Sequence, residues 1–344
     1  MKNKIGPYAN FFRHFSPDYR KRTNIVILAY HRVFDLSFDP QLLSVTPTHF
    51  KEHLKILSEQ YRVINLSDLV TDTHPTDEPT VILTFDDGYA DNVWNAFPLL
   101  KHANLPATIF ITAGYIGKKE EFWWDELEKL TLLNSHLPKK ILVSFISGEY
   151  SFMNTQGNEG IPSQSWNVLS QLKDTSQTRL YKDLHKRIKE LPLKERNDVL
   201  VSLRKICKFS PVFREGNRCL SIEEIRHLGQ SKLIEIGSHG MYHESAGNQD
   251  RGKIFEEYRI SKEILEKIVG KPISTVSYPY GSLKDIGTLS AGIIRDLGFS
   301  CACANYAGIV TKKTDRYLLP RFLVRDWAGE VFAGKLEGWM NGKK

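Results

Sequence analysis

The 344-residue sequence predicts an α/β fold, an irregular (β/α) barrel of about seven parallel strands with a mixed α+β insertion. Short apolar runs alternate with amphipathic helical patterns, which is the arrangement of βα units. Several of these runs end in polar groups, as the carboxyl ends of catalytic barrel strands do. The strand candidates lie at 24–30, 81–85, 107–112, 233–237, 274–278, 299–304 and 317–324.

Helical patterns separate these strand candidates, and several of them carry signals for the ends of helices. Ser221 and Glu224 have the spacing of a capping box at the start of one helix. Gly270 and Gly298 end two other patterns at positions suited to C-caps. We therefore expect helices near 47–60, 91–103, 221–228, 252–270 and 289–298.

Residues 118–218 break this alternation and predict an inserted subdomain that covers part of the barrel. It reads as a helix, a hairpin-like pair of strands joined around Gly148, a polar stretch and a charged helical run at 179–207. The N-terminal segment is expected to be a strap on the domain or, alternatively, an interfacial segment. The resulting division is an N-terminal strap at 1–23, a barrel at 24–117 and 219–325, an insertion at 118–218 and a C-terminal tail at 326–344.

The formal net charge of +7 suits anionic surroundings, such as a membrane face contacted peripherally or a phosphorylated glycan. The alternative is that the basic side chains only keep the surface solvated, because they are spread along the chain. The sequence has no basic stripe, recognised module or stacking platform for nucleic acid. We therefore expect no nucleic-acid partner.

No pattern in the chain predicts a membrane span or a secretory signal. No apolar run approaches the roughly 18–20 residues that a transmembrane helix needs. Basic residues interrupt the aromatic side chains near the N-terminus, and no apolar core of a signal peptide follows. The four cysteines match neither a C-x-x-C metal pattern nor a disulfide framework. We expect a cytoplasmic location, with a charge compatible with work at the inner membrane face.

Four strand candidates end in groups that are able to take part in a reaction. Because the carboxyl ends of parallel barrel strands meet at one face, we expect these groups to lie together. One such ending would mean little, but four on otherwise apolar runs are hard to explain by packing. The endings are His31, Asp86–Asp87, Ser238–His239 and Pro279–Tyr280–Gly281.

Two of these endings together predict a metal centre. The adjacent carboxylates of Asp86 and Asp87 repel each other unless a cation or a hydrogen-bond donor compensates them. The alternative is that Asp87 and Gly88 only form a turn, for which an Asp-Gly pair is well suited. His239 and His243, four residues apart, are able to share a metal, although capping or core histidines are the alternative. One carboxylate and two imidazoles make a three-ligand site with open positions, as in hydrolytic metal centres. Zn²⁺ fits this set, as do Co²⁺, Ni²⁺ and Fe²⁺.

The same motifs resemble those of the polysaccharide deacetylase family, the carbohydrate esterases that share the chitooligosaccharide-deacetylase homology domain. Residues 84–88, Thr-Phe-Asp-Asp-Gly, are similar to its first motif. Residues 238–243 are similar to the second motif, and residues 277–281 to the third. The resemblance covers 24–117 and 219–325, and it implies an irregular barrel and hydrolytic N-deacetylation.

The resemblance also implies a role for each matching residue. Asp86 would be the general base, and Asp87, His239 and His243 the metal ligands. The metal would polarise the acyl carbonyl and acidify the attacking water. The backbone N–H of Tyr280 would stabilise the oxyanion.

The sequence departs from the family pattern at two points. Ser277 stands where the third motif usually carries an arginine that orients the catalytic aspartate. Arg321 is our candidate to replace this arginine, although a lone arginine is more often a surface residue. No histidine follows His243, so the general acid cannot come from the C-terminal part of the chain. Residues 28–32 resemble a branch in which this element lies on the first strand, as in poly-N-acetylglucosamine deacetylases. His31 is then the acid candidate, with a buried strand-end histidine as the alternative.

Trp123 and Trp124, near the start of the insertion, are candidate substrate-binding residues together with Tyr280. Aromatic faces stack on sugar rings, so these side chains could line a glycan subsite. The alternative is that both tryptophans anchor the first helix of the insertion in the core.

The sequence as a whole favours a metal-dependent hydrolase that removes N-acetyl or similar acyl groups from an amino sugar of a cell-surface glycan or its precursor. We expect an N-acetylated oligosaccharide or a lipid-linked glycan as the substrate. One alternative keeps the metal site but acts on a non-sugar amide or a cyclic imide. Another is a catalytically silent glycan-binding module, which the departure at Ser277 would explain.

Overall fold

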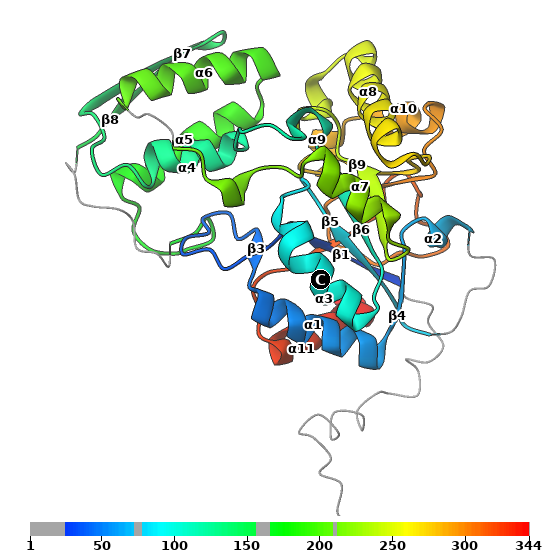
Figure 1. Ribbon diagram of the computed structural model, residues 1–344. Coiled ribbons are helices and arrows are strands. Elements are labelled where there is room, and N and C mark those ends of the chain that lie inside the picture. Colours follow the sequence, from blue (N-terminus) through cyan, green and yellow to red (C-terminus); the bar gives the residue numbers. More distant parts are fainter. Residues whose placement is uncertain (1–24, 72–77, 156–165, 209–211, 344) are drawn as a thin grey trace, which may run out of the picture.

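A curled sheet of parallel strands lies at the centre of the protein, and helices surround it (Figure 1). No helix of the described residues combines the length and the apolar character needed to cross a membrane. The strap expected at 1–23 lies outside those residues. The structure, a computed structural model, describes residues 25–71, 78–155, 166–208 and 212–343.

The sheet has eight strands in the order β11-β10-β9-β6-β5-β1-β12, with β4 paired to β5. Seven of them match the seven predicted runs, and the predicted fold class is confirmed. The sequence does not reveal β4, which has only three residues, two of them half-buried. The strands are β1 (Ile25–Tyr30), β4 (Arg62–Ile64), β5 (Thr80–Phe85), β6 (Ala107–Ile111), β9 (Ile234–Ser238), β10 (Thr275–Ser277), β11 (Cys301–Cys303) and β12 (Phe322–Leu323).

The chain near β12 links the two edges of this sheet and makes it barrel-like. Leu319 forms a parallel bridge with Cys303 of β11. Three residues later, Phe322 pairs with Leu28 of β1 at the opposite end of the strand order. A short segment therefore contacts both edges, and it carries Arg321 between these contacts.

Most predicted helices form at the expected positions. Ser221 and Glu224 make the predicted capping box, and Gly270 ends α8 in the left-handed conformation. The run at 91–103 differs because it starts as a π-helix and becomes α-helical at Phe97; Pro98, which has no N–H to donate, lies at this junction. The elements are α1 (Pro47–Gln60), η3 (Asn92–Ala96), α3 (Phe97–Ala103), α7 (Ile222–Gln230), α8 (Arg251–Val269) and α10 (Ser290–Asp296).

Several short elements complete the barrel part of the chain. They are β2 (Arg32–Val33), β3 (Ser44–Val45), α2 (Asp68–Thr71), η4 (Ala113–Tyr115), η5 (Glu215–Asn217), η6 (Ala246–Asn248) and α9 (Leu283–Ile286). β2 follows His31 directly and pairs in parallel with β3, so the two short strands hold the ends of the loop 34–43 that joins them.

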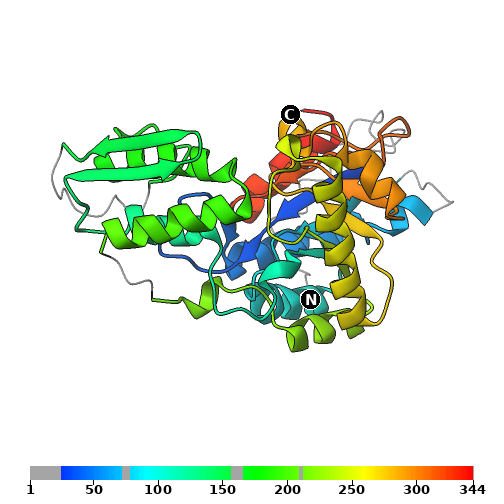
Figure 2. The same cartoon turned by 90° about the horizontal axis from the view of Figure 1, so that it is seen from above.

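The inserted part of the chain projects to one side of the barrel (Figure 2). Its two strands pair antiparallel with alternating burial, which matches the predicted hairpin around Gly148. The charged helical run forms two helices because Pro192 precedes the second one as its N-cap. The elements are α4 (Trp123–Thr131), β7 (Lys140–Phe145), β8 (Gly148–Met153), α5 (Ser176–Lys189) and α6 (Leu193–Ile206).

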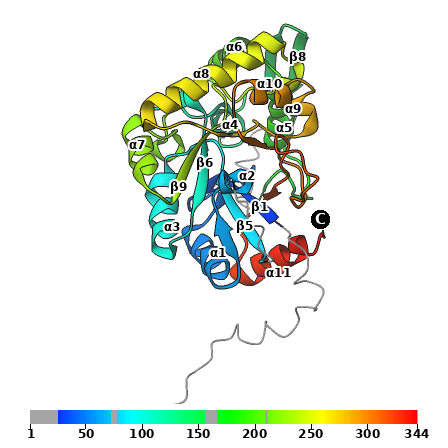
Figure 3. The same cartoon turned by 90° about the vertical axis from the view of Figure 1, so that its right-hand side faces the viewer.

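The end of the chain, expected as a tail, forms helix α11 (Gly329–Met340), which lies beside α1 (Figure 3). Phe332 and Leu336 lie four residues apart on one face and are fully buried. Trp339 stacks on Phe322 of β12, with ring centroids 4.5 Å apart. The helix therefore closes the core beneath the first strand.

His53 of α1 joins α1, α11 and β1 through a buried polar contact. Its Nε2 lies 2.7 Å from the carbonyl oxygen of Trp327, and its Nδ1 lies 3.2 Å from the hydroxyl of Tyr30. The ring stacks on Phe332 at a centroid distance of 4.0 Å. Burial lowers the pKa of His53 to about 4, so the imidazole is neutral in the folded protein at neutral pH.

We expect the free energy of unfolding to decrease as pH falls from about 6.5 to about 4, because the unfolded chain binds a proton that folded His53 does not. This contribution is up to about 3 kcal/mol. His53→Gln should be less stable than the native chain at pH 7, and urea unfolding should show the difference shrinking toward pH 4. His102→Gln on α3 is the control at an exposed position. A difference between native and His53→Gln that stays constant with pH would contradict this.

Candidate metal centre

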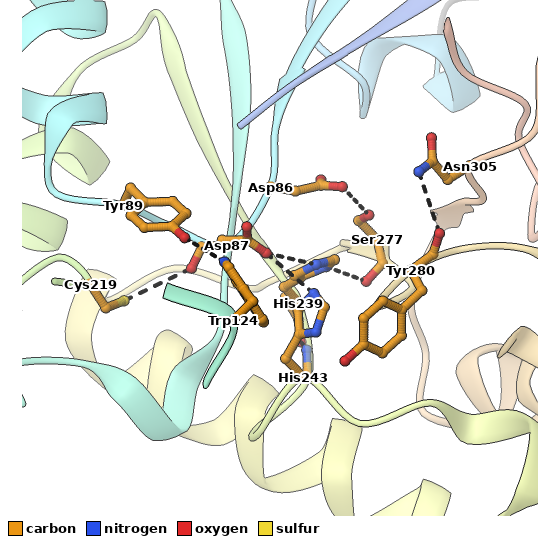
Figure 4. A network of polar contacts seen from close by, with 12 residues as sticks. Asp86, Asp87, Tyr89, Trp124, Cys219, His239, His243, Ser277, Tyr280 and Asn305 are labelled. Carbon is orange, nitrogen blue, oxygen red and sulfur yellow. Dashed lines mark hydrogen bonds and ion pairs between the residues drawn. The ribbon is translucent and has the colours of Figure 1, made fainter. Parts of the chain in front are cut away.

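Asp86, Asp87, His239 and Tyr280, which belong to three of the predicted strand endings, lie close together at the carboxyl ends of the strands (Figure 4). Asp86 and Asp87 follow β5, and His239 follows β9. Tyr280 lies in the turn after β10, and His31 follows β1. These residues come from four different βα connections, so only the fold brings them together.

Asp87, His239 and His243 form a cluster of three ligand atoms. Oδ1 of Asp87 lies 3.4 Å from Nε2 of His239 and 3.3 Å from Nε2 of His243. The three ligand atoms lie within 4.8 Å of one another, and all three residues are buried. Nδ1 of His239 lies 2.8 Å from the carbonyl oxygen of Ser277. This contact makes Nδ1 the protonated nitrogen of a neutral ring and leaves the Nε2 lone pair facing Asp87.

An unusual backbone conformation presents Asp87 to the two histidines. Asp87 has a φ of 71°, in the left-handed region that non-glycine residues rarely adopt. Gly88 follows with a φ of 76°, and a Cβ there would lie 3.2 Å from the Cα of Ile111. Strained residues of this kind cost about 1–3 kcal/mol and cluster at functional sites.

The protonation preferences of this cluster suit a cation. Oδ1 of Asp87 is buried and has no hydrogen-bond partner among the described residues. Burial raises the pKa of Asp87, but contacts with His239 and His243 outweigh it and lower the pKa well below its usual range. Burial lowers the pKa of His243 to about 4. Burial lowers the pKa of His239, but the charges of Asp86 and Asp87 outweigh this effect and raise the pKa overall. The three residues therefore fit a divalent metal.

Asp86 is held by Arg321 rather than by these histidines. Nη1 of Arg321 donates to Oδ1 of Asp86 at 2.8 Å, and Nη2 donates to Oδ2 at 2.6 Å. Nη2 also donates to the hydroxyl of Ser277 at 2.9 Å, and that hydroxyl lies 3.2 Å from Asp86 Oδ2. Arg321 thus contacts both the Asp86 carboxylate and Ser277, the residue at the position where the family motif has an arginine. Its guanidinium forms the bidentate pair expected of the missing arginine.

The pair with Arg321 keeps Asp86 ionised although the carboxylate is buried. Burial raises the pKa of Asp86. The charges of Arg321 and His239 and the hydrogen bonds from Arg321 outweigh this effect and lower the pKa to about 2. Asp86 is therefore a carboxylate throughout the neutral range. A charged, oriented oxygen next to a cation site is able to accept a proton from water.

His31 lies at the end of β1 with its side chain half-buried. Its carbonyl accepts a hydrogen bond from Asn92 Nδ2 at 2.9 Å, which fixes the backbone. Nδ1 of His31 is buried and has no hydrogen-bond partner within the described part of the chain. Burial lowers the pKa of His31, while the charges of Asp87 and Asp86 oppose this shift. The ring is thus close enough to the carboxylates to feel their charge.

Tyr280 closes the site beside His243. The two rings meet edge to face with centroids 4.5 Å apart. Tyr280 has a φ of 61°, and Asn305 Nδ2 donates to its carbonyl at 3.3 Å. Across the described residues, no hydrogen-bond acceptor contacts the Tyr280 backbone N–H. This N–H therefore remains available to a ligand.

The two predicted tryptophans are nearly fully buried. Trp123 is 2% exposed and donates from Nε1 to the hydroxyl of Tyr280 at 3.2 Å. Trp124 is 6% exposed, and its ring centroid lies 4.7 Å from that of His243. These positions favour the alternative in which both residues anchor the insertion and back the ligand residues. Stacking on a sugar ring stays a prediction.

The family model for polysaccharide deacetylases matches residues 73–192 and 214–301 of this sequence. The chain belongs to the polysaccharide deacetylase family. A relative from Bacillus subtilis, named "Putative polysaccharide deacetylase YxkH", is 30% identical over 114 residues. That match spans 32% of this chain and only 39% of the relative.

Several solved structures share the fold of this chain. The Streptococcus pyogenes deacetylase PplD in complex with acetate has a TM-score of 0.55 at 16% identity, over 91% of this chain and 98% of PplD. IcaB from Ammonifex degensii has a TM-score of 0.54 at 18% identity, over 91% and 97% of the two chains. A de-N-acetylase from Aggregatibacter actinomycetemcomitans has a TM-score of 0.53 at 16% identity, over 91% and 99%. At these identities the likeness concerns the fold alone.

Sequence reasoning missed two supports of the site. Thr84 of β5 accepts a hydrogen bond from Arg321 Nη1 at 3.1 Å, and its polar side chain within an apolar strand was a usable signal. Tyr89 accepts from Trp124 Nε1 at 2.7 Å and donates to Asp125 at 2.8 Å. Burial raises the pKa of Asp125 to about 7. An acidic residue in the first turn of a helix is so common that Asp125 gave no signal.

Replacing Arg321 by methionine should destabilise the protein by about 3–5 kcal/mol, because Asp86 would remain buried without its cationic partner. The pKa of Asp86 should also rise. Urea unfolding at pH 7 measures the loss of stability. Arg316→Met, at an exposed position on the same connection, is the control and should change stability by less than about 0.5 kcal/mol. Equal stability of the two variants would contradict the buried pair.

Proposed function

We propose that this family member is a metal-dependent hydrolase that removes N-acetyl or similar acyl groups from an amino sugar. The observation that carries the proposal is the buried cluster of Asp87, His239 and His243 beside an Asp86 that Arg321 keeps ionised. A ligand triad and a separate carboxylate are the two parts that metal-assisted amide hydrolysis requires. A glycan-binding module would need neither.

Asp87, His239 and His243 would hold the metal, which supplies Lewis-acid polarisation of the acyl carbonyl and of the attacking water. Asp86 would accept a proton from that water as its oxygen bonds to the acyl carbon. Arg321 would keep the Asp86 oxygens in place during this transfer. The backbone N–H of Tyr280 would donate to the oxygen that becomes negative in the tetrahedral intermediate.

The second half of the reaction needs an acid, because an amide anion is not a viable leaving group. We assign this role to His31, which comes from the strand next to that of Asp86 in the sheet. As the carbon–nitrogen bond breaks, the imidazolium of His31 would give its proton to the departing nitrogen. The products are a carboxylic acid and a free amino sugar.

We further propose that the substrate is an N-acetylated oligosaccharide or a lipid-linked glycan that serves as a precursor of a cell-surface glycan. The net charge of +7 favours an anionic substrate or a lipid surface, and the inner membrane face is our proposed place of work. Zinc is our first choice of metal because a two-imidazole, one-carboxylate set suits it. Cobalt, nickel and iron suit the same ligands.

Removing the metal with a chelator should abolish release of acetate or formate from N-acylated oligosaccharides, and added Zn²⁺ or Co²⁺ should restore it. Asp86→Asn should retain the metal but lose about 10²–10⁴-fold in turnover, since the proton acceptor is gone. His239→Ala is the matched control and should lose the metal itself. Mass spectrometry of the sugar product measures turnover as loss of the acyl group. Acyl release that does not depend on Asp86, or none from any amide-bearing sugar, would refute the proposal.

The role of His31 can be separated from that of Asp86 by changing the leaving group. His31→Gln should lose about 10²–10⁴-fold in hydrolysis of the N-acetyl sugar, whose nitrogen must be protonated. The same variant should retain most of its activity on an activated aryl acetate, because a phenolate leaves without a proton. Asp86→Asn should lose activity on both substrates. Equal losses of His31→Gln on both substrates would mean that His31 is not the acid.

A further inference from the structure

Helix α6 of the insertion reaches the loop that carries His243. Arg196 of this helix is fully buried, and its Nη2 donates to the carbonyl oxygen of Tyr242 at 2.6 Å. Its Nη1 donates to the carbonyl oxygen of His243 at 3.2 Å. The backbone N–H of Leu193 donates to Oε1 of Glu244 at 2.6 Å. The first turn of α6 thus contacts three consecutive residues of the ligand loop.

The two ligand histidines are oriented in different ways. His239 is fixed through its ring, since Nδ1 faces the carbonyl oxygen of Ser277. Nδ1 of His243 is buried and has no hydrogen-bond partner among the residues that the structure describes. Metal-binding histidines almost always use their second nitrogen for such a bond. The direction of the His243 ring therefore depends on the packing of its neighbours and on its backbone.

The backbone of His243 is itself in a conformation that needs support. Its φ is 53°, in the left-handed region, which costs a non-glycine residue free energy. On the barrel side, Glu257 of α8 accepts the backbone N–H of Met241 at 2.8 Å. On the insertion side, Arg196 binds the carbonyl oxygens at the other end of this loop. The loop is thus held from both subdomains.

The contacts with this loop are what account for the burial of Arg196. Among the described residues, no carboxylate lies within ion-pair distance of its guanidinium, and its Nε has no hydrogen-bond partner. Burying a charge without an ion partner is expensive. Attachment of α6 to α4 does not require Arg196, because Arg204 pairs with Glu126 there.

We propose that Arg196 is a positioning residue that holds His243 in the metal centre, so that the inserted subdomain is part of that centre. This inference rests on the proposed function, because it assumes that His243 is a metal ligand. Arg196 lies in the stretch 193–213 that the family model does not match.

Titration of the full-length chain with Co²⁺ tests this inference, with absorption spectra and dissociation constants as readouts that do not depend on activity. Arg196→Met should bind Co²⁺ about 10–100-fold more weakly than the native chain, with a changed spectrum, because the backbone support of one ligand is lost. Arg196→Lys should recover part of the affinity, since an ammonium is able to reach one of the two carbonyl oxygens. Arg204→Met on the same helix is the matched control and should bind like the native chain.

Thermal unfolding of each metal-free variant shows whether it is folded. If Arg196→Met does not fold, the Co²⁺ affinity of Arg196→Lys tests the inference instead. Native affinity and an unchanged spectrum in the folded Arg196 variants would overturn the inference and leave the proposed function intact. Equal weakening in Arg204→Met would also overturn it, because the effect would then come from general loosening of α6. A native chain that binds no Co²⁺ would overturn the proposed metal centre, and the role of Arg196 with it.

Discussion

Two buried carboxylates stand next to each other at the end of β5, and the rest of the site is arranged to compensate them. Adjacent aspartates in a low-dielectric interior repel each other, so each needs its own partner. Arg321 pairs with Asp86 through two hydrogen bonds. Asp87 turns the other way, toward two imidazoles. The left-handed φ of Asp87 is what allows the two side chains to diverge.

This division gives the two carboxylates different chemistry from the same residue type. Both oxygens of Asp86 accept hydrogen bonds from the guanidinium of Arg321. In the proposed function, this contact orients Asp86 to accept a proton and leaves the metal to Asp87. Asp87 faces the Nε2 atoms of His239 and His243, and together these residues are a ligand set that suits a divalent ion. Arg321 is able to pair with Asp86 because it lies on the segment that contacts both edges of the sheet.

The amino-acid sequence is sufficient to predict the parts of the site that depend on local pattern. Apolar runs locate seven strands, and the polar groups at their ends indicate Asp86, Asp87, His239 and His31. The sequence indicates Arg321 only as a candidate to replace the arginine that the third motif lacks at Ser277. Its contact with Asp86 cannot be deduced from spacing, because 235 positions separate the two residues. Roles in catalysis are still predictions for all of these residues.

Other features depend on tertiary contacts and have no local signal. Strand β4 is too short to show a period, and α11 is recognisable as part of the core only once Phe332 meets His53. In the sequence, Arg196 resembles any other charge of a basic helical run. Its burial follows from the position of the insertion over the ligand loop, which no pattern in the sequence encodes.

X-ray absorption spectroscopy of the zinc-loaded, full-length chain tests the central claim most directly. The account predicts one zinc per chain with nitrogen and oxygen neighbours at about 2.0–2.2 Å and the outer scattering of two imidazole rings. His243→Ala should reduce that to one ring. A zinc ion bound without imidazole neighbours, or a spectrum that His243→Ala does not change, would contradict the account.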